Sequence, residues 1–199
     1  TSASDVSPFD AAALPTGGFV TASVLRSPDA PGSSLQILSA DGRLLRAFAM
    51  PATYRVDQEA VLRRRIVRPL SGERFWTVGV TTGRAEEWSL EGRVTRTISL
   101  AGLADSQPIN GSPVFLRQVA GAVRTDDGVI VLVTGVSRNG GRVPIPPERA
   151  QDTLSRKALG ELLQSEAWLY DLQNGSRTAR TVLPGTPASI IQASSVVLY

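Results

Sequence analysis

Short runs of alternating hydrophobic and polar residues recur along the chain, and turn-forming residues separate them. The stretch from Glu73 to Leu100 shows this best, because breaks at Thr82-Gly83 and Glu91-Gly92 divide it into three strand-like runs. Such runs predict a meander of antiparallel strands, and we interpret the rest of the chain as imperfect copies of it. Comparable runs begin at Phe19, Leu35, Arg43, Val114, Val129, Ala167 and Arg177.

Two segments depart from this pattern. Residues 1–16 contain Pro8 and Pro15 and few strand formers, so they predict an extended arm. Residues 137–166 predict an insertion, because the residues from Glu148 to Ser165 favour a helix. Apolar residues four positions apart place one stripe along one side of that helix: Ala150, Leu154, Ala158 and Leu162.

Similar turns provide the evidence for a repeat. Asp41-Gly42 and Glu91-Gly92 lie in closely matching sequences, and Asn174-Gly175 matches them more loosely. Once the insertion is set aside, the turns mark four-stranded units at a period of about 40–50 residues, which is typical of propeller blades. The sequence therefore predicts an all-β fold, a propeller-like array of four-stranded antiparallel meanders with one helical insertion in the third unit. A β-sandwich or another all-β meander is the alternative.

The segments Leu35–Phe48 and Glu87–Ile98 resemble the outer half-blades of six-bladed β-propellers of the NHL and TolB-like type, in which an Asp-Gly turn joins the last two strands. The resemblance covers most of residues 17–199, which we expect to form a single all-β domain after the arm. The blade-like units are expected at about 17–50, 61–100 and 114–183, followed by a partial unit at 188–199.

The resemblance implies a ring of six blades, which takes roughly 250–300 residues, and this chain supplies about three units and part of a fourth. Either the chain is a piece of a longer protein or the array of blades is open. An open array exposes sheet edges and the surfaces between blades, and such surfaces are usually covered. This favours a protein that docks on another protein.

Histidine and cysteine are both absent from the 199 residues. Their absence excludes disulfides, thiol nucleophiles, Ser-His-Asp triads and metal sites built on these ligands. The carboxylate pairs Glu86-Glu87 and Asp126-Asp127 flank turns, and neighbouring side chains of a strand point to opposite faces. Because no catalytic motif is recognisable, the sequence predicts a protein without enzymatic activity, without a cofactor and without a metal site.

Arginine supplies almost all of the positive charge, since Lys157 is the only lysine, and the formal net charge is +3. This charge is too small to indicate a nucleic-acid partner. The run Arg63-Arg64-Arg65 does not predict a dense basic patch, because strand geometry places Arg64 on the face opposite to its two neighbours.

We expect contacts with other protein subunits at the terminal strands, the arm over 1–16 and the insertion helix. The candidate partner-binding residues are Leu154, Arg156, Lys157, Leu162, Arg63, Arg65 and Tyr199. The three tryptophans are expected to pack between blades, and an exposed aromatic platform for a sugar or another ligand is the alternative. They are Trp76, Trp88 and Trp168.

The predicted function is that of a non-catalytic interaction or scaffold subunit that docks onto a larger protein assembly. No apolar run approaches the ~18 residues of a membrane helix, so association with a membrane complex is expected to be peripheral. The small polar opening Thr-Ser-Ala-Ser-Asp fits the position after a removed leader, which predicts a periplasmic or extracellular protein, with the cytoplasm as the alternative. The alternative functions are a ligand- or carbohydrate-binding propeller, a hydrolase- or lyase-like propeller, and a fragment of a longer propeller lipoprotein or sensor.

Overall fold

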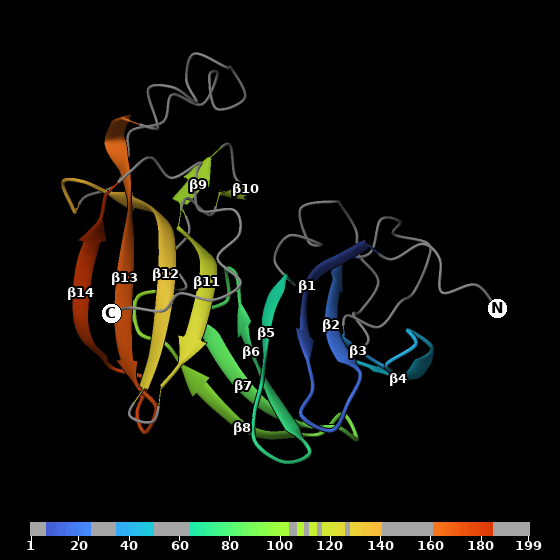
Figure 1. Cartoon of the computed structure of the whole chain (residues 1–199). Helices are drawn as coiled ribbons and strands as arrows, with labels where there is room; N and C mark the ends of the chain where they lie inside the picture. The colour runs from blue at the N-terminus through green and yellow to red at the C-terminus, as the bar shows by residue number, and fades with distance from the viewer. Residues whose placement is uncertain are drawn as a thin grey trace. The chain divides into compact units, whose positions relative to one another are not determined.

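Three four-stranded antiparallel sheets make up most of the described structure, which is a computed structural model (Figure 1). It describes residues 7–24, 35–49, 64–103, 107–109, 112–114, 117–125, 128–140 and 161–184. The chain divides into two compact units, Thr1–Ser99 and Leu100–Tyr199, each of which is described by itself. A single all-β domain over 17–199 stays a prediction.

Each sheet takes its strands from one continuous stretch of chain, in sequence order. The first sheet consists of β1 (Ser7–Ala13), β2 (Phe19–Val24), β3 (Leu35–Leu38) and β4 (Leu44–Phe48). The second consists of β5 (Arg65–Pro69), β6 (Arg74–Gly79), β7 (Arg84–Ser89) and β8 (Val94–Ser99). The third consists of β11 (Gln118–Arg124), β12 (Gly128–Ser137), β13 (Leu163–Asp171) and β14 (Arg177–Leu183). A two-stranded hairpin, β9 (Gln107–Ile109) with β10 (Ser112–Val114), precedes the third sheet.

The predicted fold class is confirmed: the described chain is an all-β, propeller-like array of four-stranded antiparallel meanders. The expected partial unit at 188–199 lies outside the described residues. The units at 61–100 and 114–183 correspond to the second and third sheets, whose strands begin at Arg65 and Gln118.

The first unit begins earlier than the sequence indicated. Instead of belonging to an extended arm over 1–16, Ser7–Ala13 forms β1 and pairs with β2. Three successive alanines gave little strand signal, because alanine is depleted in strands. Pro8 is compatible with β1, since this strand lies at the sheet edge and its register shifts between Pro8 and Asp10.

The insertion in the third sheet joins two neighbouring strands, because Ser137 at the end of β12 pairs with Leu163 at the start of β13. The predicted helix from Glu148 to Ser165 falls mostly on residues 141–160, which lie outside the described residues. Its last part is corrected, since Glu161 and Leu162 alone are helical and β13 follows directly. The ladder with β12 and β14 decides the conformation of these last residues against local helix propensity.

The aligned turns have the same backbone in the first two sheets. Gly42 and Gly92 have φ angles of 81° and 84°, and each donates its N–H to the carbonyl of the serine three residues earlier, at 2.9 and 3.0 Å. Such φ values favour glycine. In the third sheet the N–H of Asp171 donates to Ser176 at 3.0 Å, which closes a turn one residue longer. The extra residue explains the looser match of this sequence.

A second repeated feature is a bulge in the outer strand of every sheet. The register shifts at Ile37/Leu38, Glu87/Trp88 and Leu169/Tyr170 each leave one extra residue in the facing strand. The extra residues are Leu45, Thr95 and Thr178. In the second and third sheets the threonine hydroxyl donates across the bulge, from Thr95 to Glu87 O at 3.2 Å and from Thr178 to Leu169 O at 3.3 Å.

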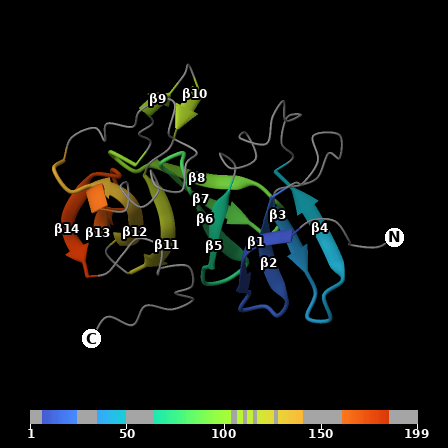
Figure 2. The ribbon, with the colours of Figure 1, turned by 90° about the horizontal axis from the view of Figure 1, so that it is seen from above.

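The first and second sheets share one hydrophobic core. Strand β5 lies beside β1, as both views show (Figures 1 and 2). The core is built from apolar residues of both sheets and of the β1–β2 turn: Leu14, Val20, Ala22, Leu35, Ile37, Val67, Phe75 and Trp88.

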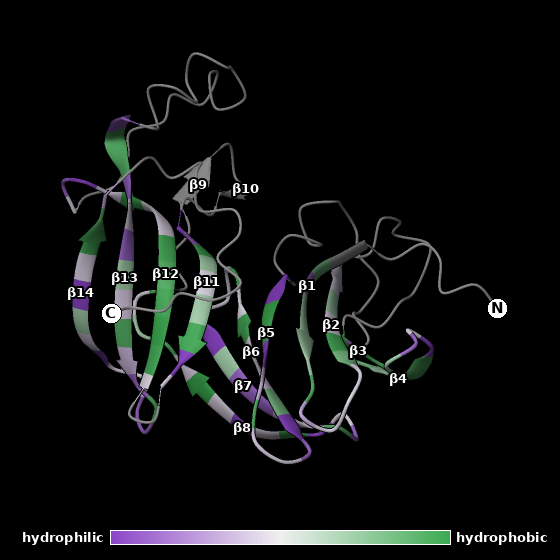
Figure 3. Cartoon of the chain, viewed as in Figure 1, coloured by the Kyte–Doolittle hydropathy of each residue, from purple (hydrophilic) through white to green (hydrophobic). Residues whose placement is uncertain are grey.

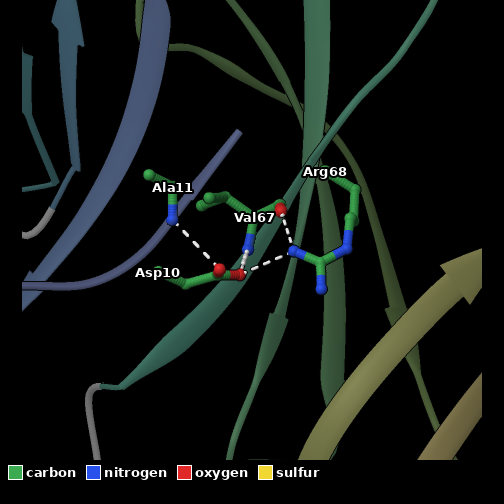
Figure 4. A network of polar contacts seen from close by, with 4 residues as sticks. All are labelled: Asp10, Ala11, Val67 and Arg68. Carbon is green, nitrogen blue, oxygen red and sulfur yellow. Dashed lines mark hydrogen bonds and ion pairs between the residues drawn. The ribbon is translucent and has the colours of Figure 1, made fainter. Parts of the chain in front are cut away.

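A carboxylate joins these two sheets at their first strands. Asp10 on β1 accepts hydrogen bonds from the N–H of Val67 at 2.9 Å and from Nη1 of Arg68 at 2.7 Å, both on β5 (Figure 4). Its other oxygen accepts from the N–H of Ala11 at 3.0 Å. Charge-assisted hydrogen bonds of this kind are stronger than neutral ones, so Asp10 fixes β1 against β5.

The core of the second unit lies along β12 and β13. Figure 3 shows β12 as an almost continuously hydrophobic strand, as its apolar run predicts. Val129, Val131 and Val133 are fully buried on one face of this strand. On β13 the rings of Trp168 and Tyr170 lie 6.3 Å apart beside them.

Candidate functional site

Two of the seven predicted partner-binding residues lie within the described part of the chain. Leu162 immediately precedes β13 and is 38% exposed, and Arg65 lies on β5. The other five lie outside the described residues: Leu154, Arg156, Lys157, Arg63 and Tyr199. A role of these seven residues in partner binding stays a prediction.

Arg65 is engaged within the first unit. Its Nη1 forms an ion pair with Glu86, and its guanidinium carbon lies 5.5 Å from the ring centre of Trp88. Arg64 points to different surroundings, 5.2 Å from the ring centre of Phe9. These arginines therefore stabilise contacts inside the unit, each on a different part of it.

The tryptophans are buried, with 2% of Trp76, 6% of Trp88 and 2% of Trp168 exposed. Trp88 packs against Phe48 of the first sheet, with 5.8 Å between ring centres. Its Nε1–H donates to Thr77 Oγ1 at 3.1 Å. Packing between blades is thus confirmed for Trp88, and none of the three rings forms an exposed platform.

The contact between the first and second sheets defines two kinds of sheet face. We call the face of the second sheet that packs against the first sheet its leading face, and the face of the first sheet that receives it a trailing face. The leading face contributes Val67, Phe75 and Trp88, and the trailing face contributes Val20, Leu35 and Ile37. All six residues are at most 6% exposed.

The bulges allow the three sheets to be aligned residue by residue. In each sheet the bulge in the fourth strand lies opposite the same two positions of the third strand. Residues that face each other across a ladder share one side of the sheet. On the leading faces, equivalent positions are held by Leu38, Trp88 and Tyr170, and by their pairing partners Phe19, Phe75 and Val129. On the trailing faces, they are held by Val20, Trp76 and Ile130, by Leu35, Ala85 and Ala167, and by Ile37, Glu87 and Leu169.

The leading face of the first sheet is exposed at Phe19, where the equivalent positions of the other leading faces are buried. Phe19 is 41% exposed, whereas its equivalents Phe75 and Val129 are 0% exposed. Leu38 is half-buried, whereas Trp88 and Tyr170 are buried. Phe19 lies at the end of β2, and Thr21 and Ser23 on the same face of this strand are buried, so the face is exposed at this end alone. An exposed phenylalanine beside a buried face is suited to contact with another surface.

The trailing face of the third sheet is covered less completely than those of the other two sheets, although Leu132 and Ser165 on it are buried. Ile130, Ala167 and Leu169 are half-buried. On the first sheet the equivalent residues are Val20, Leu35 and Ile37, all buried, and on the second they are Trp76, Ala85 and Glu87, also buried. Among the three four-stranded sheets, the leading face of the first is thus exposed at Phe19, and the trailing face of the third is half-buried at Ile130, Ala167 and Leu169.

A polar cluster on the third sheet contains the most deeply buried carboxylate. Glu166 is 1% exposed and accepts hydrogen bonds from Trp168 Nε1 at 2.6 Å and Gln164 Nε2 at 2.7 Å. The guanidinium of Arg177 lies 4.3 Å from the ring centre of Trp168. Burial raises the pKa of the nearby Tyr170, whose hydroxyl donates to Ala101 O at 2.9 Å. These groups form hydrogen bonds and ring contacts with one another, so we interpret the cluster as structural.

In the part of the chain that the structure describes, no three acidic side chains gather in a way that could hold a metal ion. No helix in the same residues has the length and apolar character needed to cross a membrane.

No known protein family matches the chain, and no curated protein matches it. Solved structures align with it at low similarity. One is the quinohemoprotein alcohol dehydrogenase ADHIIG from Pseudomonas putida HK5, with 12% identity and a TM-score of 0.40 over 89% of this chain. Another is the glutaminyl cyclase of Myxococcus xanthus, with 13% identity and a TM-score of 0.36 over 88% of this chain. The chain spans 22% of the dehydrogenase and 70% of the cyclase.

These alignments require one correction. Both proteins are named as enzymes, which contradicts the prediction that the chain is not an enzyme. The absence of histidine and cysteine was too weak a ground for that prediction, since carboxylates and other side chains also serve as acids, bases and nucleophiles. At these TM-scores the likeness carries no argument that this chain has either activity.

Proposed function

We propose that this chain is an interaction subunit, a propeller-like scaffold that docks onto another protein through the exposed end of the leading face of its first sheet, at Phe19. The observation that carries the proposal is the exposure of Phe19, at 41%, against 0% for the equivalent Phe75. Phe75 is buried because a trailing face packs on it, and the same geometry at Phe19 calls for a similar partner surface.

Chemistry of the open face supports docking of a protein sheet. The leading face of the first sheet carries Ala11, Phe19, Thr21, Gln36 and Leu38. None of these side chains is ionisable, so covering them requires no charge to leave water. Burial of the exposed part of apolar side chains contributes roughly 25 cal/mol per Å².

In this proposal the partner is another protein, and the assembly is larger than this chain. The blades are of the NHL and TolB-like type, which the matching turns at Gly42 and Gly92 support. The assembly lies in the periplasm or outside the cell, and fractionation of the source cells tests that location.

Site-specific photocrosslinking tests the docking. A photoreactive amino acid replaces Phe19, or replaces Val94 in a control, and the protein is illuminated in its native source. Val94 is 45% exposed on the outer strand of the second sheet and outside the open face. We expect a discrete protein adduct from position 19 and none from position 94. Equal yields from both positions, or no adduct from position 19, would contradict the proposal.

A further inference from the structure

We propose that the exposed end of the first sheet, at Phe19 and Gly42, is a subsite for an aromatic side chain on a strand of the partner protein, with a cationic side chain two residues before it. This inference rests on the proposed function and names the chemistry of the partner. Two equivalent places in the first unit differ: the place at Gly92 is filled by an aromatic ring, and the place at Gly42 is open.

The place at Gly92 is filled by the ring of Phe48, which belongs to the neighbouring sheet. A Cβ added to Gly92 would lie 2.7 Å from Cγ of this ring. The ring centre of Phe48 also lies 6.0 Å from that of Phe75 and 5.8 Å from that of Trp88. Tilted contacts between aromatic rings at these distances are favourable. The second sheet therefore shows how an aromatic side chain of a neighbouring strand is received beside an outer turn.

The place at Gly42 has the same backbone without a ring. Gly42 and Gly92 have φ angles of 81° and 84°, and the N–H of each donates to the carbonyl of the serine three residues earlier. Among the described residues, no atom lies within 4 Å of a Cβ added to Gly42. An aromatic ring can therefore approach Gly42 as closely as Phe48 approaches Gly92.

The side chains beside Gly42 complete the subsite. Phe19 and Leu38 face each other across the β2–β3 ladder, as Phe75 and Trp88 do across the β6–β7 ladder. Phe19 is 41% exposed, so its ring is accessible to another ring. Because Leu38 is smaller than Trp88, it leaves more room, and the subsite accepts phenylalanine, tyrosine or tryptophan.

Further apolar side chains continue this surface across the sheet. Ala13, Phe19, Leu38 and Leu44 pair in succession across the four strands, so they share one side of the sheet. Leu44 is 44% exposed, and the bulge residue Leu45 is 56% exposed. The other two bulges carry threonines that form hydrogen bonds, whereas this bulge carries an exposed leucine. Departures of this kind from a local rule are expected at functional sites.

A carboxylate lies beside the filled place and beside the open one. Glu91, in the outer turn of the second sheet, is attracted electrostatically by Arg46, which lies two residues before Phe48 on β4. Asp41 holds the equivalent position in the first sheet. A strand that places its ring against Gly42 in the same way brings the residue two positions earlier to Asp41. The negative charge of Asp41 favours a cation there.

The outer strands of this chain do not offer a second such pair of side chains. Arg46 and Phe48 face Ile37 and Leu35, and Phe48 is already packed on the second sheet. The residues at the equivalent positions are Arg96 and Ile98 in the second sheet and Ala179 and Thr181 in the third. Neither pair contains an aromatic residue, so the described outer strands of a second copy do not match the subsite. This favours a different protein as the partner.

A synthetic peptide tests the subsite. Acetyl-Thr-Thr-Arg-Thr-Phe-Thr-amide keeps the spacing of Arg46 and Phe48 and has threonine, a strand former, at the other positions. The peptide is titrated into the isotope-labelled full chain, and NMR follows the amides of Phe19 and Gly42. We expect saturable shifts of both amides at millimolar peptide.

Two altered peptides measure the two side chains separately. With serine in place of phenylalanine, binding should weaken about 10–100-fold, because burial of the ring is lost. With glutamine in place of arginine, it should weaken about 2–5-fold, and high salt should remove this difference.

Variants of the chain locate the binding. Gly42→Asn places a side chain in the open space, and asparagine tolerates a positive φ angle better than most residues. Gly72→Asn is the matched control, because Gly72 has a φ angle of 71° and open space in the described structure around an added Cβ. Phe19→Ser removes the ring, and Val94→Ser is its control, since Val94 is 45% exposed. We expect Gly42→Asn and Phe19→Ser to lose the shifts and both controls to bind like the unmodified chain. The amide spectra check that each variant is folded.

Three results would overturn the inference: no saturable shift with the parent peptide, equal binding of the serine peptide, or unchanged binding by folded Gly42→Asn and Phe19→Ser. Failure here is distinguishable from failure of the proposed function. If position 19 crosslinks to a protein in the native source while the peptide does not bind, docking stands and the aromatic subsite is wrong. If the peptide binds and position 19 gives no adduct, the subsite stands and docking onto a protein is wrong.

Discussion

The ring of Phe48 lies directly against Gly92, so that a Cβ added to this glycine would be 2.7 Å from Cγ of the phenylalanine. Phe48 belongs to the outer strand of the first sheet and Gly92 to the outer turn of the second. The ring also contacts Phe75 and Trp88, with 6.0 and 5.8 Å between ring centres. The absence of a side chain at Gly92 therefore permits the close approach of the two sheets.

Gly92→Ala should destabilise the protein more than Gly42→Ala. Both glycines have nearly equal φ angles, 84° and 81°, so both variants carry the same backbone cost of about 1–2 kcal/mol. A Cβ at Gly42 has no atom within 4 Å, so only Gly92→Ala also displaces Phe48, which adds about 1–3 kcal/mol. Urea unfolding measures the difference. Equal losses in the two variants would show that the Phe48 ring moves aside freely.

The threonine hydroxyls at the bulges should contribute measurably to the free energy of unfolding. Thr95→Val and Thr178→Val each remove a hydrogen bond to a main-chain carbonyl and should lower the free energy of unfolding by about 0.5–1.5 kcal/mol. The first sheet lacks this bond, because Leu45 holds the equivalent position and is 56% exposed. Leu45→Thr should therefore gain a similar amount by donating to Ile37 O. Leu45→Val is the control, since it is β-branched without a hydroxyl, and an equal gain there would rule out the hydrogen bond.

Asp10→Asn should loosen β1 from β5. The variant keeps the shape of the side chain but loses the charge that faces Arg68, and we expect a loss of about 1–2 kcal/mol because the pair is partly exposed. Amide hydrogen exchange gives a local reading, since the N–H of Val67 donates to Asp10 and should exchange faster. Glu73→Gln changes an exposed carboxylate and serves as the control. Unchanged exchange at Val67 would remove Asp10 from its role as a link.

The turn carboxylates should titrate below their usual range. A hydrogen bond from the Ser39 hydroxyl is the main cause that lowers the pKa of Asp41 below 3.8. Ser39→Ala should raise the pKa of Asp41, as followed by NMR titration. A lowered folded-state pKa stabilises the protein above the unfolded-state pKa, and this contribution is lost as the pH falls through the folded-state value. The stability difference between the two proteins should therefore be present at neutral pH and shrink in acid. A pKa of Asp41 that does not change in Ser39→Ala would contradict this.

The sequence predicted the turns and most of the strands better than it predicted which sheet faces are covered. The turns at Gly42 and Gly92 could be predicted, because glycine adopts those φ angles more easily than other residues. The strand at Ala11–Ala13 was not predicted, because alanine has a low strand propensity. Pairing with β2 holds this segment in place.

The exposure of Phe19 could not be predicted from local sequence patterns, for a physical reason. Phe19 and Phe75 each stand two residues before a threonine, in sequences that look alike, and yet one is exposed and the other is buried. What differs is the neighbouring sheet, which is a property of the whole array. The bulges add to the difficulty, because each one shifts the alternation by one residue and so exchanges the two faces beyond it.

Each sheet takes its four strands from one unbroken stretch of chain, and this has a consequence for how such proteins can vary in length. A gene duplication or deletion that covers a whole stretch would add or remove a complete sheet without cutting any ladder. The ladders of the remaining sheets would be unaffected, because none of them joins strands from two different stretches.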